Sequence, residues 1–307
     1  MIEVQSLGSL EAPELENALQ TKTWVKVTSP TPFEIERLTR VLKLDPELVE
    51  DCLDPEERPR FESEDDYVLL VLRIPLSKAE RDIPSIVTFP IGIFLSENFL
   101  VTVQARELPF LSAKPRRRAK FYLDNPRNLL HYFIRRITIE FQRSLDVVEE
   151  DIDELQEEVL TSSRPDSLPS LFLAAKVLVY LNAAIMADIK AMNDLRRHSK
   201  DPVWRDTLED LEIDLQQVSD MINIQREILT STMDAYASAI SNNLNVVMKV
   251  LASISLILMI PTLLASLYGM NLDLPLADDP NAFWIIFGFG ALLSLISVAM
   301  LWWQEWI

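Results

Sequence analysis

The sequence predicts a mixed α+β domain that is followed by long helices and by two C-terminal transmembrane helices. Three observations lead to this fold class. Short runs of β-forming residues occur within residues 1–120. An apolar period of 3.6 residues, typical of helices, begins at Pro126. Two uncharged stretches near the C-terminus, 250–268 and 282–303, are each long enough to cross a bilayer.

The composition limits the classes of function. Forty-seven acidic and 29 basic side chains give a net charge of −18, which favours cations as partners and argues against nucleic acid. The single cysteine, Cys52, and the two histidines offer neither a disulfide framework nor a His/Cys metal site. Because no arrangement of nucleophile, base and metal ligands is visible, we expect no enzyme and no organic cofactor. The N-terminus lacks the regions of a cleavable signal peptide, so none is expected.

The first 120 residues are predicted to contain short strands and two short helices. Residues 23–27 alternate as a strand, and amphipathic helices are expected after Pro32 and after Pro46. Cys52 has no basic neighbour in the sequence that would lower its pKa, so we interpret it as a core residue and not as a nucleophile. Three further β-rich runs, the last two joined as a hairpin, cover residues 67–74, 86–95 and 99–103.

Three long helices are predicted next. The first runs from Pro126 to the Ser-Ser-Arg-Pro of residues 162–165, and its second half is strongly acidic. That acidic face either is simply solvated or attracts cations. A second helix is expected over 168–198, and a third begins at Asp201-Pro202. From 203 to 260 there is neither Pro nor Gly, so this helix would extend for about 87 Å and enter the membrane without a break.

The first transmembrane stretch carries one stripe of small and polar side chains. Its nineteen uncharged residues, 250–268, correspond to about 28 Å of helix. The stripe either packs against a neighbouring helix or lines a water-filled path, and its spacing alone favours neither strongly. Steps of three and four residues place on one helical face Asn245, Met248, Ala252, Ser255, Met259, Thr262 and Ser266.

The second span and the loop before it set the topology. Residues 282–303 give about 33 Å of helix, and tryptophans at the end of this stretch are typical of a membrane interface. Every Lys and Arg precedes or borders the first span, so both termini are expected in the cytoplasm. The external loop carries Asp273, Asp278 and Asp279, which either concentrate divalent cations or keep the loop hydrated.

A short motif closes the first span. Tyr268-Gly269-Met270-Asn271, eleven residues before the second span, resembles the GMN motif of the CorA family of magnesium channels. The approach to the membrane, with Asn245 and Lys249, is similar to the family's usual run, as is the stretch from Glu50 to Tyr67 in the N-terminal domain. Two departures stand out, since the chain ends without the basic run of many members and the loop lacks a Met-Pro-Glu.

The resemblance implies a divalent cation channel or transporter that moves Mg²⁺, with Co²⁺ or Ni²⁺ as further substrates, across the inner or plasma membrane. It implies a funnel-shaped homopentamer, because one stripe cannot enclose a pore and the number five is the family's. Gly269, Met270 and Asn271 would form the pore mouth, with the stripe lining the pore. Cytosolic Mg²⁺ would also regulate gating.

The regulatory residues come from the same comparison. Counting back from the motif, Asp210 falls where the family places an acidic sensor, and Glu209 and Asp214 flank it. Two other functions stay open, a zinc transporter of the same superfamily and a non-conducting, membrane-anchored helical scaffold or sensor. The predicted divisions are a cytoplasmic α/β domain 1–120, a cytoplasmic stalk 121–245, a first span 246–271, an external loop 272–281, a second span 282–303 and a cytoplasmic tail 304–307.

Overall fold

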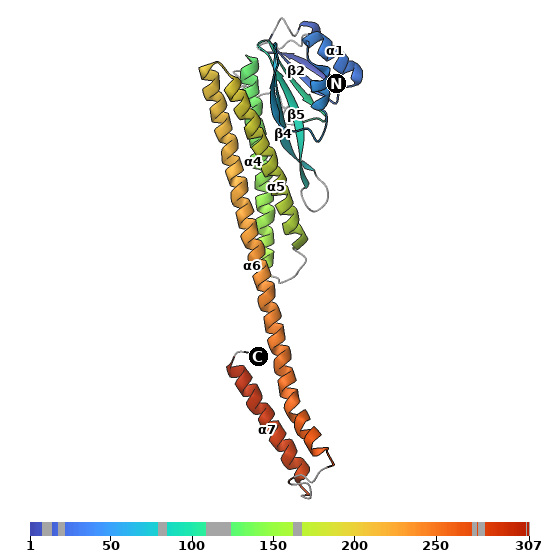
Figure 1. The fold of residues 1–307 in the computed structure, drawn as a ribbon, viewed down its shortest axis with the longest axis vertical. Coiled ribbons are helices and arrows are strands. Elements are labelled where there is room, and N and C mark those ends of the chain that lie inside the picture. Colours follow the sequence, from blue (N-terminus) through green and yellow to red (C-terminus); the bar gives the residue numbers. More distant parts are fainter. Residues whose placement is uncertain are drawn as a thin grey trace. The chain divides into compact units, whose positions relative to one another are not determined.

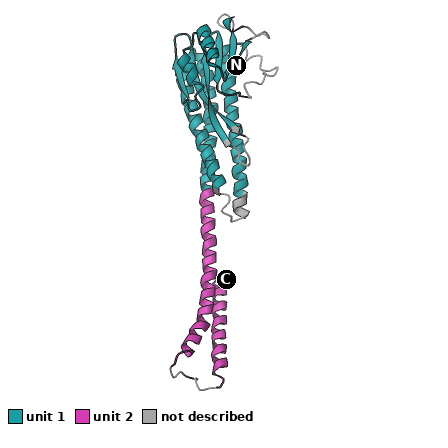
Figure 2. Cartoon of the chain, turned by 90° about the vertical axis from the view of Figure 1, so that its right-hand side faces the viewer, with its two compact units in different colours: residues 1–231 teal, residues 232–307 magenta. Residues whose placement is uncertain are grey.

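The computed structural model describes residues 1–7, 14–17, 22–78, 85–108, 124–161, 168–271, 275, 280–304 and 306. The chain divides into two compact units, Met1–Ser231 and Thr232–Ile307 (Figure 2). The elements of the first unit that precede the long helices are β1 Ile2–Ser6, η1 Leu15–Asn17, β2 Thr23–Thr28, α1 Pro32–Leu42, α2 Pro46–Asp51, β3 Arg60–Ser63, β4 Val68–Lys78, β5 Ser85–Leu95 and β6 Phe99–Gln104.

The described strands form one mixed sheet in the order β1-β2-β6-β5-β4-β3. β2 and β6 pair in parallel, and the other neighbours pair antiparallel. The mixed sheet confirms the predicted class for this domain. β1 and β3 were not predicted, and both are short strands that pair at the two edges of the sheet.

Side chains alternate across the sheet and are buried on both of its faces. On one face, Val25, Val101 and Val103 pack with Leu38 of α1 and Val49 of α2 in one core. On the other face, the ring of Trp24 in β2 lies 5.2 Å from that of Phe133 in α4, Pro126–Thr161. Figure 1 shows α1 on one side of the sheet and α4 and α5, Leu168–His198, on the other. Helices on both faces explain why all six residues of β6 are buried.

Local signals fix the two short helices. Thr31 and Glu34 form a reciprocal capping box before α1, and Pro32 occupies its first turn. The helix ends where Lys43 adopts a left-handed conformation, with φ at 56°. Asp45 caps α2 by accepting a hydrogen bond from the Glu47 amide at 2.9 Å. These caps confirm that Pro32 and Pro46 mark helix starts.

Cys52 lies in the core, as predicted. Its side chain is fully buried, its Sγ donates to the Leu48 carbonyl at 3.1 Å, and burial raises its pKa to about 12. A Cβ on Gly92 of β5 would lie only 2.1 Å from Cys52 Sγ, so the missing side chain of Gly92 makes room for the thiol. Cys52 is therefore a packing residue.

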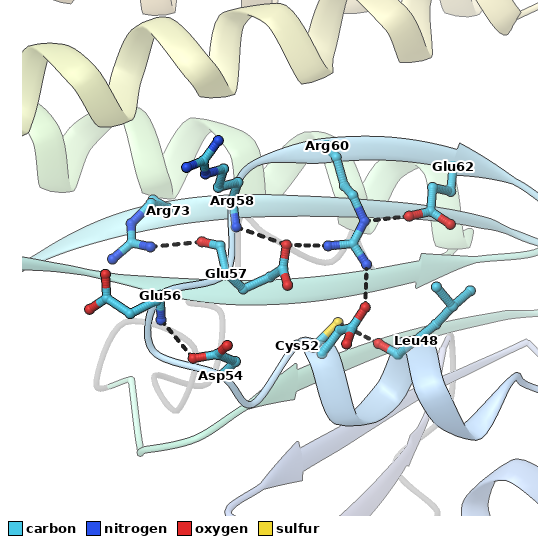
Figure 3. A network of polar contacts seen from close by, with 10 residues as sticks. Leu48, Cys52, Asp54, Glu56, Glu57, Arg58, Arg60, Glu62 and Arg73 are labelled. Atoms are coloured by element: carbon cyan, nitrogen blue, oxygen red, sulfur yellow. Dashed lines mark hydrogen bonds and ion pairs between the residues drawn. The ribbon is translucent and has the colours of Figure 1, made fainter.

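The charged stretch after α2 forms a structural network (Figure 3). The Arg60 guanidinium pairs with Asp51 at 2.9 Å and also with Glu57 and Glu62. Arg73 of β4 donates to the Glu57 carbonyl at 2.7 Å. Three carboxylates around one half-buried guanidinium hold the turn between α2 and β3 against the sheet.

The long helices agree with the periodicity. They are α4 Pro126–Thr161, α5 Leu168–His198, α6 Pro202–Tyr268 and α7 Ala282–Trp303. α6 is one unbroken helix of 67 residues that contains Pro261, and α6 and α7 are apolar enough to cross a membrane. α5 also meets that criterion by length and composition. Its apolar residues, however, pack against β4 and α4 in the first unit, where Leu178, Leu181 and Ile185 are fully buried.

Cys52 should be unreactive in the folded protein. A pKa raised from 9.0 to about 12 leaves about a thousandfold less thiolate than an exposed cysteine has. A water-soluble maleimide should label wild type only as it unfolds. Gly92→Ala should label faster, because overpacking costs about 1–3 kcal/mol. The control is Gly288→Ala, whose new Cβ meets nothing within 4 Å. Rapid labelling of native wild type, or equal rates for both variants, would contradict this packing.

Candidate functional site

The predicted stripe forms one exposed face of α6 in the second unit. All seven residues are exposed in the chain, and the methionines Met248 and Met259 are exposed by 61% and 60%. The hydroxyls of Ser255 and Thr262 donate to the carbonyls of Leu251 and Leu258 at 2.8 and 2.7 Å. Each hydroxyl thereby satisfies its donor within the helix and keeps its oxygen as an outward acceptor. An acceptor of this kind can bind the hydrogens of water around a cation.

α7 packs on a different face of α6. A Cβ on Gly290 of α7 would lie 3.2 Å from Leu264 Cδ1 and 4.0 Å from Pro261 Cα. An apolar cavity of about 550 Å³ between the two helices is lined on the α6 side by Pro261, Leu264, Ala265, Tyr268 and Gly269. At about 100° per residue, Pro261 lies roughly opposite Met259. Packing against α7 therefore does not account for the stripe, while packing against a helix of another chain and lining a water-filled path both stay open.

The GMN motif ends α6. The Gly269 amide donates to the Ala265 carbonyl at 3.0 Å, and the Met270 amide donates to the Leu267 carbonyl at 3.3 Å. Gly269, Met270 and Asn271 are all exposed. Gly269 does not adopt a left-handed conformation, but an added Cβ would crowd the Ala265 carbonyl at 3.2 Å. The Tyr268 hydroxyl donates to the Pro275 carbonyl at 3.2 Å, which ties the loop back to the helix end.

The external acidic residues cannot be placed. Asp273, Asp278 and Asp279 lie outside the residues that the structure describes, so their role at a pore mouth stays a prediction.

The acidic residues near the start of α6 fall into two groups. Glu212 is buried and accepts hydrogen bonds from Asn193 at 2.8 Å and from Arg196 Nε at 2.9 Å. Glu209 is half exposed and also pairs with Arg196, at 3.8 Å. Both carboxylates therefore help to join α6 to α5. A buried carboxylate with these partners is a structural clamp, and it is not free to bind a cation.

Asp210 and Asp214 have a different setting. Asp210 is exposed and Asp214 is half-buried, and both act on His131 of α4. Burial lowers the pKa of His131 and Arg135 lowers it further, whereas Asp214 and Asp210 oppose that shift. Within the described part of the chain, no three His, Cys, Asp or Glu side chains converge closely enough to hold a metal. One chain thus supplies at most part of the predicted sensor.

Sequence reasoning missed the partners of Glu212, although a signal was present. Glu212 falls among Leu208, Leu211 and Leu215, which are the buried positions of this part of α6. A carboxylate at an apolar-stripe position needs a partner on the neighbouring helix. The exposed acidic face of α4 was predicted, and there Asp146, Glu149, Glu150, Asp153 and Glu154 line one shallow depression.

Comparisons with known proteins agree with the geometry. A family model described as CorA-like Mg²⁺ transporter protein matches residues 20–303. The cobalt/magnesium transport protein CorA of Methanocaldococcus jannaschii is 26% identical over 327 residues, which span 100% of this chain and 99% of that protein. The protein of the same name from Thermotoga maritima is 25% identical over 262 residues, 82% of this chain and 74% of that protein.

The fold comparison covers the same length. The complete structure of the CorA magnesium transporter from Methanocaldococcus jannaschii superposes with a TM-score of 0.84 at 25% identity, over 100% of this chain and 99% of that chain. The superposition includes the sheet domain, the long helices and the two apolar helices. Because the family model matches nearly the whole sequence, this chain belongs to the CorA-like Mg²⁺ transporter family, whose members are transporters and not enzymes.

Proposed function

We propose that the chain forms a channel that moves Mg²⁺ across the cell membrane, with Co²⁺ or Ni²⁺ as further substrates. The observation that carries the proposal is the uncovered face of α6, where polar and small side chains lead from Asn245 to Asn271. Two relatives named cobalt/magnesium transport proteins support Mg²⁺ and Co²⁺, whereas Ni²⁺ comes from the family resemblance alone. The span from 250 to 271 contains no Cys or His, so a bare soft ion finds no preferred ligand there.

Several copies must assemble for this face to conduct. One helix exposes its stripe along one side, so a closed path needs a ring of chains with their stripes turned to a common axis. The family's number is five, and we propose a homopentamer. The stripe and the α7 contact occupy different sides of α6, which leaves the stripe available to face such an axis.

Asn271 would meet the ion at the outer mouth. Mg²⁺ gives up its water reluctantly and is often bound through its hydration shell. A ring of neutral amide oxygens accepts hydrogen bonds from that shell without holding the ion as tightly as carboxylates would. We place both termini in the cytoplasm and the loop with Asp273, Asp278 and Asp279 outside, where its carboxylates raise the local concentration of cations.

Regulation would use the free carboxylates of α6. Asp210 and Asp214 lack the Arg196 pairing that engages Glu209 and Glu212. If neighbouring copies bring such carboxylates together, their repulsion opposes the closed assembly and a bound Mg²⁺ relieves it. Loss of cytosolic Mg²⁺ would then loosen the assembly, and the unbroken α6 would connect this change to the membrane span.

Asn271→Ala should reduce Mg²⁺ influx into proteoliposomes by about tenfold or more, since each hydrogen bond to a charged, hydrated ion is worth about 1.5–3 kcal/mol. Influx is measured with a Mg²⁺-sensitive dye inside the vesicles. Asn223→Ala, at an exposed position of α6 in the first unit, is the matched control and should conduct normally. Wild-type influx through Asn271→Ala would remove this residue from the ion path.

Cysteines placed on the stripe should react with small water-soluble thiol reagents in the membrane-embedded protein. We expect labelling at Met248→Cys, Met259→Cys and Thr262→Cys, and little at Leu264→Cys, which faces α7. The native cysteine needs no replacement, because Cys52 is buried. Comparable labelling of Leu264→Cys and the stripe positions would show that the stripe has no special access to water.

Asp210→Ala should shift inhibition by cytosolic Mg²⁺ to concentrations about five- to tenfold higher, as expected for the loss of one coupled site. Protection of the protein against limited proteolysis by Mg²⁺ should shift in parallel. Asp206→Ala, one turn earlier and exposed, serves as the control for charge alone. If inhibition and protection keep their wild-type concentration dependence in Asp210→Ala, this carboxylate does not sense Mg²⁺.

A further inference from the structure

Asp188 is a buried acid outside both proposed cation sites. It lies on α5, where this helix packs on the sheet, and none of its surface is exposed. Its Oδ1 accepts a hydrogen bond from the backbone N–H of Arg73 at 2.8 Å. Its Oδ2 has no hydrogen-bonding partner among the residues that the structure describes. A carboxyl group in this setting needs a physical explanation, because buried polar atoms are nearly always paired.

The backbone of β4 explains the first contact. β3 pairs with β4 only as far as Val71, so the following part of β4 has β5 as its one partner among the described strands. The Arg73 amide donates to Asp188 in place of a strand carbonyl. An unpaired amide buried under a helix would be costly, and Asp188 removes that cost. The carboxyl therefore joins α5 to β4.

Among the described residues, no cation forms an ion pair with this carboxyl. Arg73 is the ionised residue that faces it from β4, but its guanidinium donates instead to Thr88, Glu57 and Pro55 at 2.7–3.0 Å. Within the described residues, no charged group of β3, β5, α4 or α6 adds to the effect of Arg73 on Asp188. Burial raises the pKa of Asp188 well above its ordinary value, although the Arg73 amide and guanidinium act against the rise.

We propose that Asp188 is a proton-dependent latch between α5 and β4, closed when its carboxyl is neutral and weakened when the carboxyl ionises. The neutral acid still accepts from the Arg73 amide, and it avoids an uncompensated charge in an apolar contact. Because the folded-state pKa is the raised one, the latch is complete at acidic pH. Its contribution to stability falls as the pH rises from the ordinary aspartate range through the folded-state pKa.

Loss of the contact between Asp188 and Arg73 would affect the turn that precedes β3. Arg73 also holds the carbonyls of Pro55 and Glu57, and Glu57 pairs with Arg60 (Figure 3). A shift of β4 at Arg73 therefore disturbs the turn that precedes β3. This inference does not depend on ion conduction, and it makes the α5–sheet contact of the first unit sensitive to pH.

Hydrogen exchange of the full-length protein in detergent tests the latch. After correction for intrinsic exchange rates, protection of the peptide that contains the Arg73 amide should fall at least tenfold between about pH 5 and about pH 9. Asp188→Asn should show no such fall, because the amide keeps an acceptor for Arg73 and cannot ionise. Asp206→Asn, at an exposed position of α6, should behave like wild type. The same pH dependence in wild type and Asp188→Asn would overturn the proposal.

A second measurement uses wild type alone, in case Asp188→Asn folds poorly. Infrared spectroscopy should detect the carbonyl band of a protonated carboxylic acid that persists above the pH at which ordinary aspartates have ionised, and this band should disappear as the pH rises further. Exposed carboxyls are ionised above that range and do not contribute. Absence of any protonated carboxyl band above the ordinary aspartate range would overturn the latch.

Discussion

The structure depends on the continuity of α6. This helix continues for 67 residues, from the first unit into the second, without a glycine. Inside a bilayer each backbone N–H and C=O must be satisfied within the protein, and a continuous helix does this residue by residue. Pro261 removes one amide donor within the apolar stretch, at the position where Gly290 allows α7 to come close. Because the backbone groups of such a helix are hydrogen-bonded within it, each of its faces can contact a different environment.

The faces of α6 differ in what they contact. In the first unit, Leu208, Leu211, Leu215 and the Arg196–Glu212 pair join α6 to its neighbours, while Asp210 stays exposed. In the second unit, α7 covers the side of Pro261 and Leu264, and the polar stripe is left uncovered. Polar side chains that face outward in an apolar segment are costly in lipid, and small ones are typical of helix–helix contacts, so together they indicate a watery or proteinaceous surrounding. This supports the proposed ring of chains around a path.

Local patterns predicted most of the fold. The helix starts at Pro32, Pro46 and Pro202 could be predicted from the sequence, because capping and proline preferences act over one turn. Long-range contacts could not be predicted from the sequence, because no local signal places β2 parallel to β6 or Asp188 against the Arg73 amide. Within the candidate site, the stripe was predicted as one face, but only the position of α7 shows that this face is uncovered. The pairing of Arg196 with Glu209 also needed the structure, since Arg196 comes from another helix, whereas Asp210 was chosen from the sequence.

The central claim is that the stripe of α6 surrounds the ion path. The most direct test is block of Mg²⁺ flux by Cd²⁺ in a Met259→Cys variant, because a ring of thiolates at one level of a pore binds this soft ion strongly. The account predicts a block that a chelator reverses and that is absent from wild type and from Leu264→Cys. Undiminished flux through Met259→Cys at saturating Cd²⁺, or equal block of Leu264→Cys, would contradict it.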